Sequence, residues 1–543
     1  MHYFPILCLI SAISVPLLNG CESISREQGS TPSDPVPTVM RAAQLDANVK
    51  RTPGATPKTA TGSAASEKVV EAEPTIWDRM RSRFRLDLDS SNPRVQSQLN
   101  WYSSNQRYMD RTAQRAKRYL PYILNELEAR DMPGELALLP LVESAYDPFA
   151  YSHGRASGLW QFIPSTGRAF GMGQNWWYDG RRDIVASTQG ALSYLKQLAD
   201  RFDGDYKLAL ASYNAGGARV ARAVRRNQRQ GRPTDFSSLQ LPRETRHYVP
   251  KLIALARIIQ NPEAHGIELP EIANKPYFEV VDIGGQMDLA QAADMAGVEV
   301  NEIYRLNPGF NRWATAPNGP HRLLIPAHAS EQFRAALENM PPEERVSWRN
   351  YTVESGDTLI GLARQFNTTP DVIRNNNKLR GHTIRKGQTL LIPVAGKSGN
   401  FYALSEQKRR QSRQAASGGS NQSRIDYRVT SGDTLWDIAS AHDVSVQKLA
   451  KWNSMAPGDP IKPGDQLAIW SSSANAGKTL GDKRDNMVRR VGYTVRSGDS
   501  LRQIANRFNV GVSDITQWND LNMQDYLQPG QQLKLFVDIR NTH

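Results

Sequence analysis

Three stretches of the C-terminal half repeat one pattern. The segments YTVESGDTLIGLARQF at 351, YRVTSGDTLWDIASAH at 427 and YTVRSGDSLRQIANRF at 493 share a single frame. An asparagine recurs 21 residues after the glycine of each Ser-Gly-Asp, at Asn377, Asn453 and Asn519. Self-similarity over tens of residues means that each copy is one supersecondary unit. The chain is therefore expected to be multidomain, and 543 residues also exceed what one core usually holds.

The composition of each copy predicts a small α+β unit. A short run of β-branched and aromatic residues leads to Ser-Gly-Asp, where glycine permits a tight turn and aspartate can cap the helix that follows. Apolar residues then fall at helical spacing, as at Leu359, Leu362 and Phe366. A second helix is expected from Pro370, since proline suits the first helical position. The run LLIPV closes the unit as a strand, which gives the order βααβ.

These copies resemble LysM modules, which bind polymers that contain N-acetylglucosamine, such as peptidoglycan and chitin. The resemblance implies that the first strand–helix loop and the loop around the recurrent asparagine contact the sugar. The residues concerned are Gly356, Asp357, Thr358 and Asn377, then Gly432, Asp433, Thr434 and Asn453, then Gly498, Asp499, Ser500 and Asn519. Capping and turn formation would account for the same aspartates and asparagines. A segment from Tyr277 to Pro326 resembles a divergent version of the unit.

Composition shifts divide the rest of the chain. Polar stretches rich in glycine and serine, GGSNQS and SSSANAGKT, separate the copies and read as flexible linkers. The N-terminal part is rich in Ser, Thr, Pro and Ala, which predicts a disordered tether. The expected plan is a signal peptide (1–20), a tether (21–75), a helical domain (76–270), a divergent LysM-like segment (275–330), LysM modules at 349–395, 425–471 and 491–538, and linkers at 396–424 and 472–490.

The segment from about 76 to 270 is predicted to be helical throughout. Its apolar residues recur at spacings of three and four, as in AKRYLPYILNELEARDM and QGALSYLKQLADRF. Leu192, Leu195, Leu198 and Phe202 form one face of the second helix. The sequence therefore predicts an all-α domain.

One carboxylate interrupts an apolar run in this domain. In GELALLPLVESAYDPFA, Leu136, Leu139 and Glu143 fall at i, i+3 and i+7, so Glu143 is expected on the same helical face as two leucines. Burial raises the pKa of such a carboxyl group and suits it to general-acid catalysis. An ordinary salt bridge, to Arg168 or Arg181 for example, is the structural alternative.

Three further motifs accompany Glu143-Ser144: ASGLWQFIPSTGRAFG at 156, ALASYNAGGARV at 209 and ETRHYVPKLIAL at 244. The series resembles the lytic transglycosylases of glycoside hydrolase family 23, and the D-type group of that family also carries C-terminal LysM modules. The resemblance covers nearly the whole chain after the tether. It implies an all-α lysozyme-like catalytic domain of the goose-type or Slt-like kind, followed by the βααβ modules.

The resemblance also implies roles for single residues. Glu143 would be the only acid/base and Ser144 would orient it. Gln161 would line the cleft, in a stretch where the family commonly has Met in place of Trp160. Tyr213 and Asn214 would contact the sugar, and Tyr248 would form a hydrogen bond near the carboxylate. Core packing of Trp160 and a turn role of Asn214 remain alternatives.

In this family the C6 hydroxyl of N-acetylmuramic acid attacks its own anomeric carbon and leaves a 1,6-anhydro end. The tethered hydroxyl replaces a second catalytic carboxylate. One rival is a hydrolytic muramidase that uses Glu143 with Asp147, although Pro148 is expected to end the helix there. Another is a non-catalytic peptidoglycan-binding lipoprotein, in which the modules carry the whole function.

The N-terminus MHYFPILCLISAISVPLLNGC has the apolar region of a secretory signal. Leu18 to Cys21 resembles a lipobox, which implies lipidation of Cys21, while the missing Lys or Arg before the apolar run and Asn19 depart from the pattern. Glu22 then fits sorting to the periplasmic face of the outer membrane of a Gram-negative bacterium. An uncleaved anchor or simple secretion are the alternatives.

Partners and cofactors follow from charge and cysteine use. The formal net charge of +13 favours anionic partners such as nucleic acid, acidic polymers or an anionic membrane surface, and charge alone does not choose among them. A nucleic-acid partner would leave the lipobox and the modules unexplained, so none is expected. With only Cys8 and Cys21, the mature chain is expected to have no disulfide. No Cys/His cluster with metal-ligand spacing and no phosphate-binding loop is present, so neither metal nor cofactor is expected.

Overall fold

A computed structural model describes residues 74–538 except 89–90, 417–421, 473–487, 497, 509, 520 and 522–526. The expected signal peptide, its tether and Cys21 therefore lie outside the described residues, as does most of the linker 472–490. Among the described residues, no helix combines the length and apolar character that crossing a bilayer requires.

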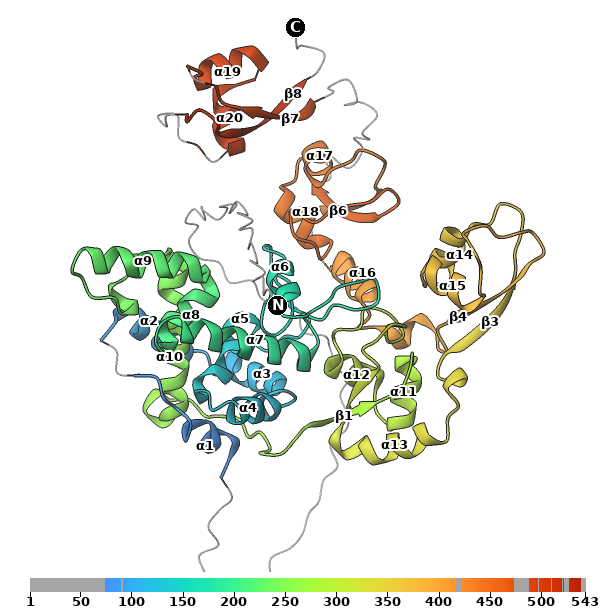
Figure 1. Ribbon diagram of the computed structural model, residues 1–543, viewed down its shortest axis with the longest axis horizontal. Coiled ribbons are helices and arrows are strands. Elements are labelled where there is room, and N and C mark those ends of the chain that lie inside the picture. Colours follow the sequence, from blue (N-terminus) through green and yellow to red (C-terminus); the bar gives the residue numbers. More distant parts are fainter. Residues whose placement is uncertain are drawn as a thin grey trace, which may run out of the picture. The chain divides into compact units, whose positions relative to one another are not determined.

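In the described residues of the first domain the named elements are all helices (Figure 1). They are α1 (Ile76–Arg81), α2 (Pro93–Ser103), α3 (Gln106–Ala116), α4 (Leu120–Ala129), η1 (Gly134–Leu138), α5 (Leu139–Ser144), α6 (Pro164–Ala169), α7 (Ile184–Asp200), α8 (Tyr206–Ala215), α9 (Gly217–Arg229), η2 (Phe236–Ser238), α10 (Arg243–Gln260) and η3 (Glu263–His265). This confirms the all-α prediction.

Helix α10 is central to this domain. It packs against α2, α8 and α5, and its residues from Leu252 to Ala256 are buried. Helix α7 begins where Asp183 accepts a hydrogen bond from the Ala186 amide, which satisfies one of the free N–H groups of the first turn. Leu192 and Leu195 of its predicted face enter the same core, and Leu198 packs in a small neighbouring cluster. This core fixes the helices that carry the candidate catalytic residues.

The three repeats each fold as two helices beside a two-stranded antiparallel sheet (Figure 1). The first contains β3 (Ser347–Thr352), α14 (Leu359–Gln365), α15 (Pro370–Asn376) and β4 (Thr389–Val394). The second contains β5 (Gln422–Arg428), α17 (Leu435–Ala441), α18 (Val446–Trp452) and β6 (Gln466–Ser472). The third contains β7 (Val488–Thr494), α19 (Leu501–Phe508), α20 (Val512–Asn519) and β8 (Gln532–Asp538). The predicted order βααβ is confirmed.

A fourth unit of the same order lies between the helical domain and the first repeat. It contains β1 (Phe278–Asp282), α11 (Leu289–Ala296), α12 (Val300–Leu306) and β2 (Arg322–Pro326), followed by η4 (Ala327–Ala329), α13 (Ser330–Glu338) and η5 (Pro342–Glu344). We call it the divergent module. Phe278, Leu306 and Leu324 extend into the core of the helical domain, while Trp177 and Tyr178 of the helical domain pack in the core of the module.

One asparagine closes each unit in the same way. In the first repeat, Asn377 donates to the carbonyls of Ile373 and Leu391, both at 2.8 Å, and accepts from the Leu391 amide at 2.7 Å. The side chain thereby joins the end of the second helix to the last strand. Asn453 and Asn519 form the same three bonds, and so does Asn307 in the divergent module.

The Ser-Gly-Asp turn differs from its prediction in one respect. Asp357 does not cap the helix: it accepts hydrogen bonds from the Tyr351 hydroxyl and the Glu354 amide, at 2.9 and 2.7 Å, and so fixes the turn. Thr358 is the cap, because its hydroxyl accepts from the Gly361 amide. Gly356 has φ of 91°, which only glycine adopts at little cost.

The divergent module differs from the repeats in its loops. The loop before α11 and the loop after α12 are bonded to each other: the Thr315 amide donates to the Met287 carbonyl and the Leu289 amide to that of Trp313, both at 2.9 Å. These are the two loops that the LysM resemblance assigns to sugar contacts. In the divergent module they close against each other.

The expected linker 396–424 contains regular structure. It carries η6 (Gly399–Tyr402) and α16 (Glu406–Ala416). Tyr402 is buried, and its hydroxyl donates to Asp288 of the divergent module at 2.8 Å. The glycine- and serine-rich composition that predicted a flexible linker covers only the end of this segment.

Candidate active site

Glu143 lies at the end of a short helix. The run from Gly134 forms the 3₁₀ segment η1 before α5, so Leu136 and Glu143 are not on one regular helical face as the periodicity suggested. Helix α5 ends at Ser144, because Ala145 and Tyr146 have φ of 49° and 55°. The helix thus ends before Asp147, not at Pro148 as predicted.

The Glu143 carboxyl group has one direct polar partner among the described residues. The Tyr248 hydroxyl of α10 donates to Oε1 of Glu143. The residue keeps some solvent exposure, while its carboxyl group is surrounded by protein. Burial raises the pKa of this carboxyl to about 7, against the hydrogen bond from Tyr248, which lowers it. The nearby Glu244 carboxylate raises the pKa further and the Lys251 ammonium lowers it. Near neutral pH, Glu143 can therefore exist in both protonation states.

The loop from Gly158 to Gln161 is held by side chains from two helices. Ser144 of α5 lies 2.9 Å from the Leu159 carbonyl, and Tyr213 of α8 donates to the Trp160 carbonyl at 2.7 Å. The Trp160 side chain is fully buried, and its indole N–H donates to Thr188 at 3.0 Å. Trp160 is therefore a core residue, while its backbone orders the loop next to Glu143.

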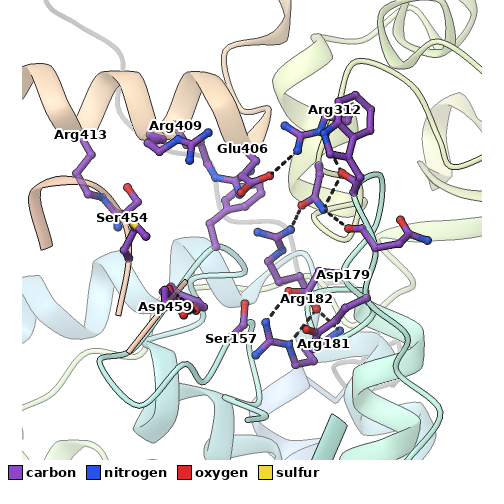
Figure 2. Close-up of a pocket in the computed structure, with 18 of the residues that line it drawn as sticks. Ser157, Asp179, Arg181, Arg182, Arg312, Glu406, Arg409, Arg413, Ser454 and Asp459 are labelled. Carbon is purple, nitrogen blue, oxygen red and sulfur yellow. Dashed lines mark hydrogen bonds and ion pairs between the residues drawn. The ribbon is translucent and has the colours of Figure 1, made fainter. Parts of the chain in front are cut away.

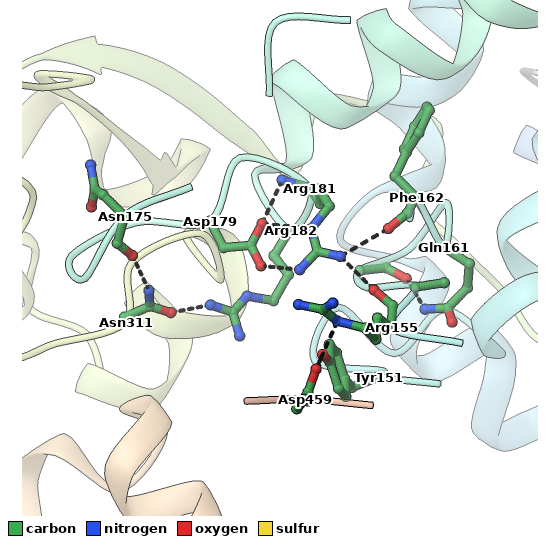
Figure 3. A network of polar contacts seen from close by, with 12 residues as sticks. Tyr151, Arg155, Gln161, Phe162, Asn175, Asp179, Arg181, Arg182, Asn311 and Asp459 are labelled. Carbon is green, nitrogen blue, oxygen red and sulfur yellow. Dashed lines mark hydrogen bonds and ion pairs between the residues drawn. The ribbon is translucent and has the colours of Figure 1, made fainter. Parts of the chain in front are cut away.

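Gln161 continues this loop with φ of 50°. Its side-chain amide donates to the Gly158 carbonyl at 2.8 Å. Gly158 has φ of 82°, and a Cβ atom there would lie 2.2 Å from the Arg181 carbonyl. Figure 3 shows Arg181 beside the loop, where it pairs with Asp179 at 2.7 Å and donates to the carbonyls of Phe162 and Arg155. Arg181 thus supports the loop and does not pair with Glu143.

Asn214 lies at the end of α8, next to the start of α10. Its Oδ1 accepts from the Thr245 hydroxyl at 2.7 Å, and its Nδ2 lies 3.4 Å from Oε1 of Glu244. The amide is therefore oriented from α10, the helix that also supplies Tyr248. Contacts of Tyr213 and Asn214 with a sugar stay predictions.

Glu244 is a residue near Glu143 to which the sequence motifs assigned no role. It occupies the position four residues before Tyr248 on α10, and this i, i+4 spacing could have placed it on the same helical face. The charges that act on Glu143 are Glu244 and Lys251. Asp147, the second carboxylate of the hydrolytic alternative, instead accepts from the Phe149 amide in its own turn at 2.9 Å.

The predicted sugar-binding residues of the modules have local roles in the structure. Asp433 and Asp499 accept from Tyr427 and Tyr493, as Asp357 does from Tyr351. Thr434 caps α17, and Ser500 accepts from the Gln503 amide at the start of α19. Gly432 and Gly498 have φ of 92° and 88°. The side-chain amides of the three asparagines donate to backbone carbonyls of their own units. Sugar contacts of these loops stay a prediction.

Among the described residues, no group of three or more His, Cys, Asp or Glu side chains could hold a metal ion. The chemistry that the site offers is that of one protonatable carboxyl group with a hydroxyl donor, next to an ordered loop.

Family models match each part of the chain. The Transglycosylase SLT domain matches residues 122–236, and the family described as Lytic transglycosylase MltD, LysM-like domain matches 277–341. The LysM domain matches 351–393, 427–470 and 493–536. The predicted fold class and the resemblance to LysM modules are thereby confirmed.

Curated relatives extend the match over the chain. Membrane-bound lytic murein transglycosylase D of Escherichia coli K12 is 36% identical over 414 residues, which are 74% of this chain and 86% of the relative. A putative tributyltin chloride resistance protein of Alteromonas is 39% identical over 31% of this chain and 80% of its own. Among solved structures, lytic transglycosylase Slt of Pseudomonas aeruginosa is 25% identical, covers 27% of this chain and 24% of its own, and has a TM-score of 0.22. On the extent of the first match, the chain belongs to the family of membrane-bound lytic murein transglycosylase D.

Proposed function

We propose that the chain cleaves the β-1,4 bond between N-acetylmuramic acid and N-acetylglucosamine in peptidoglycan and leaves 1,6-anhydromuramic ends. The observation that carries this proposal is the Glu143 carboxyl, which burial brings to a pKa of about 7 and which Tyr248 holds by a hydrogen bond. A carboxyl group in this state can donate a proton and later accept one.

The reaction needs only this group for proton transfer. Glu143 donates its proton to the glycosidic oxygen, and the N-acetylglucosamine side leaves with a new hydroxyl. The C6 hydroxyl of the muramic residue then attacks the anomeric carbon and gives its proton to the Glu143 carboxylate. The enzyme returns to its starting state and no water is consumed. Since the nucleophile is already tethered, proximity takes the place of a second catalytic group.

The surrounding residues support these steps. The Tyr248 hydroxyl stabilises the carboxylate after the first proton transfer. Ser144 bonds to the Leu159 carbonyl and thereby ties the end of α5 to the loop that carries Gln161. We assign Gln161, Tyr213 and Asn214 to substrate contact, with Ser144 as a positioning residue.

The test is mass spectrometry of the muropeptides that the purified chain releases from peptidoglycan in heavy-oxygen water. Anhydro ends are lighter by one water than hydrolytic ends, carry no heavy oxygen and are not reduced by borohydride. Labelled, reducible ends as the main product would instead establish hydrolysis.

We also propose that the three LysM repeats hold the enzyme on the wall and that Cys21 carries a lipid anchor at the outer membrane. Several modules on one chain raise the effective concentration at a polymer surface. In the divergent module the corresponding loops are bonded to each other, so we assign it a supporting role.

Replacing Cys21 by Ala should move the protein from the membrane fraction to the soluble fraction of the periplasm, because acyl chains would be the anchor. Fractionation followed by immunoblotting measures this. Retention in washed membranes would favour an uncleaved anchor.

A further inference from the structure

A cavity of about 390 Å³ lies beside the loop that carries Gln161. Figure 2 shows its wall, to which the helical domain, the divergent module, α16 and the second repeat contribute. Tyr151 and Ser157, which belong to the same loop region as Gln161, line it. One water molecule occupies about 30 Å³ in the liquid. The cavity is therefore several times larger than a single small ion needs. The cavity has room for a segment of a larger ligand.

The cavity wall is rich in arginine. The Glu406 carboxylate of α16 lies 3.3 Å from Arg312, and burial opposes its ionisation. The guanidinium groups of Arg312, Arg182, Arg410 and Arg409 nevertheless hold the pKa of Glu406 below its usual range. Four cations thus act on one anion.

Neutral groups hold three of these arginines in place. Arg312 stacks on the Trp176 ring at 4.1 Å, and Arg409 lies over the Phe149 ring at 4.2 Å. Arg182 is buried and donates to the Asn311 side chain, while its Nε has no hydrogen-bond partner among the described residues. These contacts orient the guanidinium groups without neutralising their charge.

Two of the other three carboxylates in the wall have cationic partners, and the third, Asp465 of the second repeat, accepts from the Lys462 amide at 2.8 Å. Asp179 pairs with Arg181 at 2.7 Å, and Asp459 pairs with Arg155 at the same distance. Burial, and next the charge of Arg182, lowers the pKa of Arg409 to about 9, so both disfavour its charged form. Uncompensated charge in a cavity is costly, so the arrangement favours entry of an anion.

We propose that this arginine cavity binds the carboxylate groups of the short peptides that peptidoglycan strands carry. The inference rests on the proposed function, because it takes the glycan strand to lie at Glu143 and Gln161. Guanidinium forks match carboxylates in bidentate geometry. Because Ser157 and Tyr151 belong to the loop region of Gln161 and line the cavity, a peptide on a sugar bound at Gln161 could extend along them into it. Inorganic phosphate and anionic lipid are the other anions that the test must separate.

The test measures binding with the full chain carrying Glu143→Gln, so that no probe is cleaved and the result is independent of the reaction type. The probes are a disaccharide tetrapeptide from peptidoglycan, the same disaccharide without peptide, inorganic phosphate and vesicles with anionic phospholipid. Arg410→Gln and the pair Arg409→Gln with Arg410→Gln are compared with Lys408→Gln, a charge-matched control on the same helix outside the cavity wall.

We expect the double variant to weaken binding of the disaccharide tetrapeptide about tenfold or more, the scale of one lost charge-assisted contact. Binding of the peptide-free disaccharide should stay the same, as should all binding by Lys408→Gln. Unchanged tetrapeptide binding, equal losses for both disaccharides, or selective loss of phosphate or vesicle binding would each overturn the proposal. Should the double variant unfold in a thermal melt, Arg410→Gln alone and the salt dependence of tetrapeptide binding decide the question in the same way.

Discussion

Burial opposes the ionisation of both Glu143 and Glu406, yet the pKa of Glu143 is raised and that of the partly exposed Glu406 is lowered. Around Glu143 the direct partner is the neutral hydroxyl of Tyr248, and burial raises the pKa to about 7. Around Glu406 four guanidinium groups outweigh burial, and the pKa is lowered. Burial alone therefore does not make a proton donor. The charges that surround the carboxyl group decide whether it can give up a proton or serves as a fixed anion.

The largest expected effect comes from Glu143→Gln. The amide has nearly the same shape but cannot donate a proton and then accept one, so turnover of peptidoglycan should fall by about 10³-fold or more. Release of soluble muropeptides measures the rate. Asp147→Asn is the matched control and should keep nearly full turnover, since Asp147 bonds within its own turn. Comparable losses in both variants would argue for a pair of catalytic carboxylates.

The same substitution should stabilise the fold at alkaline pH. A carboxyl whose folded pKa is raised destabilises the native state as pH rises above its unfolded value of about 4.5, and the full penalty is reached above pH 7. Glu143→Gln should therefore gain up to about 3 kcal/mol in unfolding free energy at pH 8 and little at pH 4. Urea unfolding at the two pH values measures this difference.

Glu406→Gln should act in the opposite sense on stability. Its lowered pKa means that the ionised form stabilises the fold above the unfolded pKa, and that this contribution is lost as pH falls through the folded value. Because the side chain is partly exposed, we expect a loss of about 1–2 kcal/mol at pH 7. Urea unfolding checks it against Glu331→Gln, an exposed control that should change little. An increase in stability would show that the arginines do not depend on Glu406.

The smallest expected effects concern the pH profile. If protonated Glu143 is the acid, kcat/KM should fall as pH rises through about 7. Tyr248→Phe removes a hydrogen bond that lowers the pKa, so this falling limb should move to higher pH. Glu244→Gln removes a negative charge and should move it to lower pH, with less than about a tenfold change in rate at a fixed pH. If the falling limb of the kcat/KM profile stays at the same pH in both variants, the titrating group is not Glu143.

Local patterns predicted the elements well. The 3–4 spacing of leucines placed α7 in the core, and Pro370 marked the start of α15. The length of α5 was not predictable in this way, because its end depends on the left-handed backbone of Ala145 and Tyr146. The cap of α14 was misassigned to Asp357 since Asp and Thr are both good caps and only the fold selects between them.

Arrangements that join distant segments could not be predicted. The motifs named Glu143 and Tyr248, yet the bond between them spans 105 residues of sequence and requires the packing of α5 on α10. Arg182, Arg312 and Glu406 come from three separate parts of the chain, and no spacing rule connects them. The composition of 396–424 likewise did not predict α16, whose contacts include Arg312 of the divergent module and Asn453 of the second repeat.

The asparagine that joins the second helix to the last strand bears on how such chains gain and lose modules, both in evolution and in protein engineering. Asn307, Asn377, Asn453 and Asn519 each join their own helix to their own strand, and Asn453 also accepts from Gln414 of α16. A copy that is duplicated, deleted or transplanted by recombination therefore carries its own closure with it. The number of LysM repeats can therefore change while each remaining repeat keeps its own closure, so the strength of wall binding can be adjusted by the number of repeats, in nature or in the laboratory.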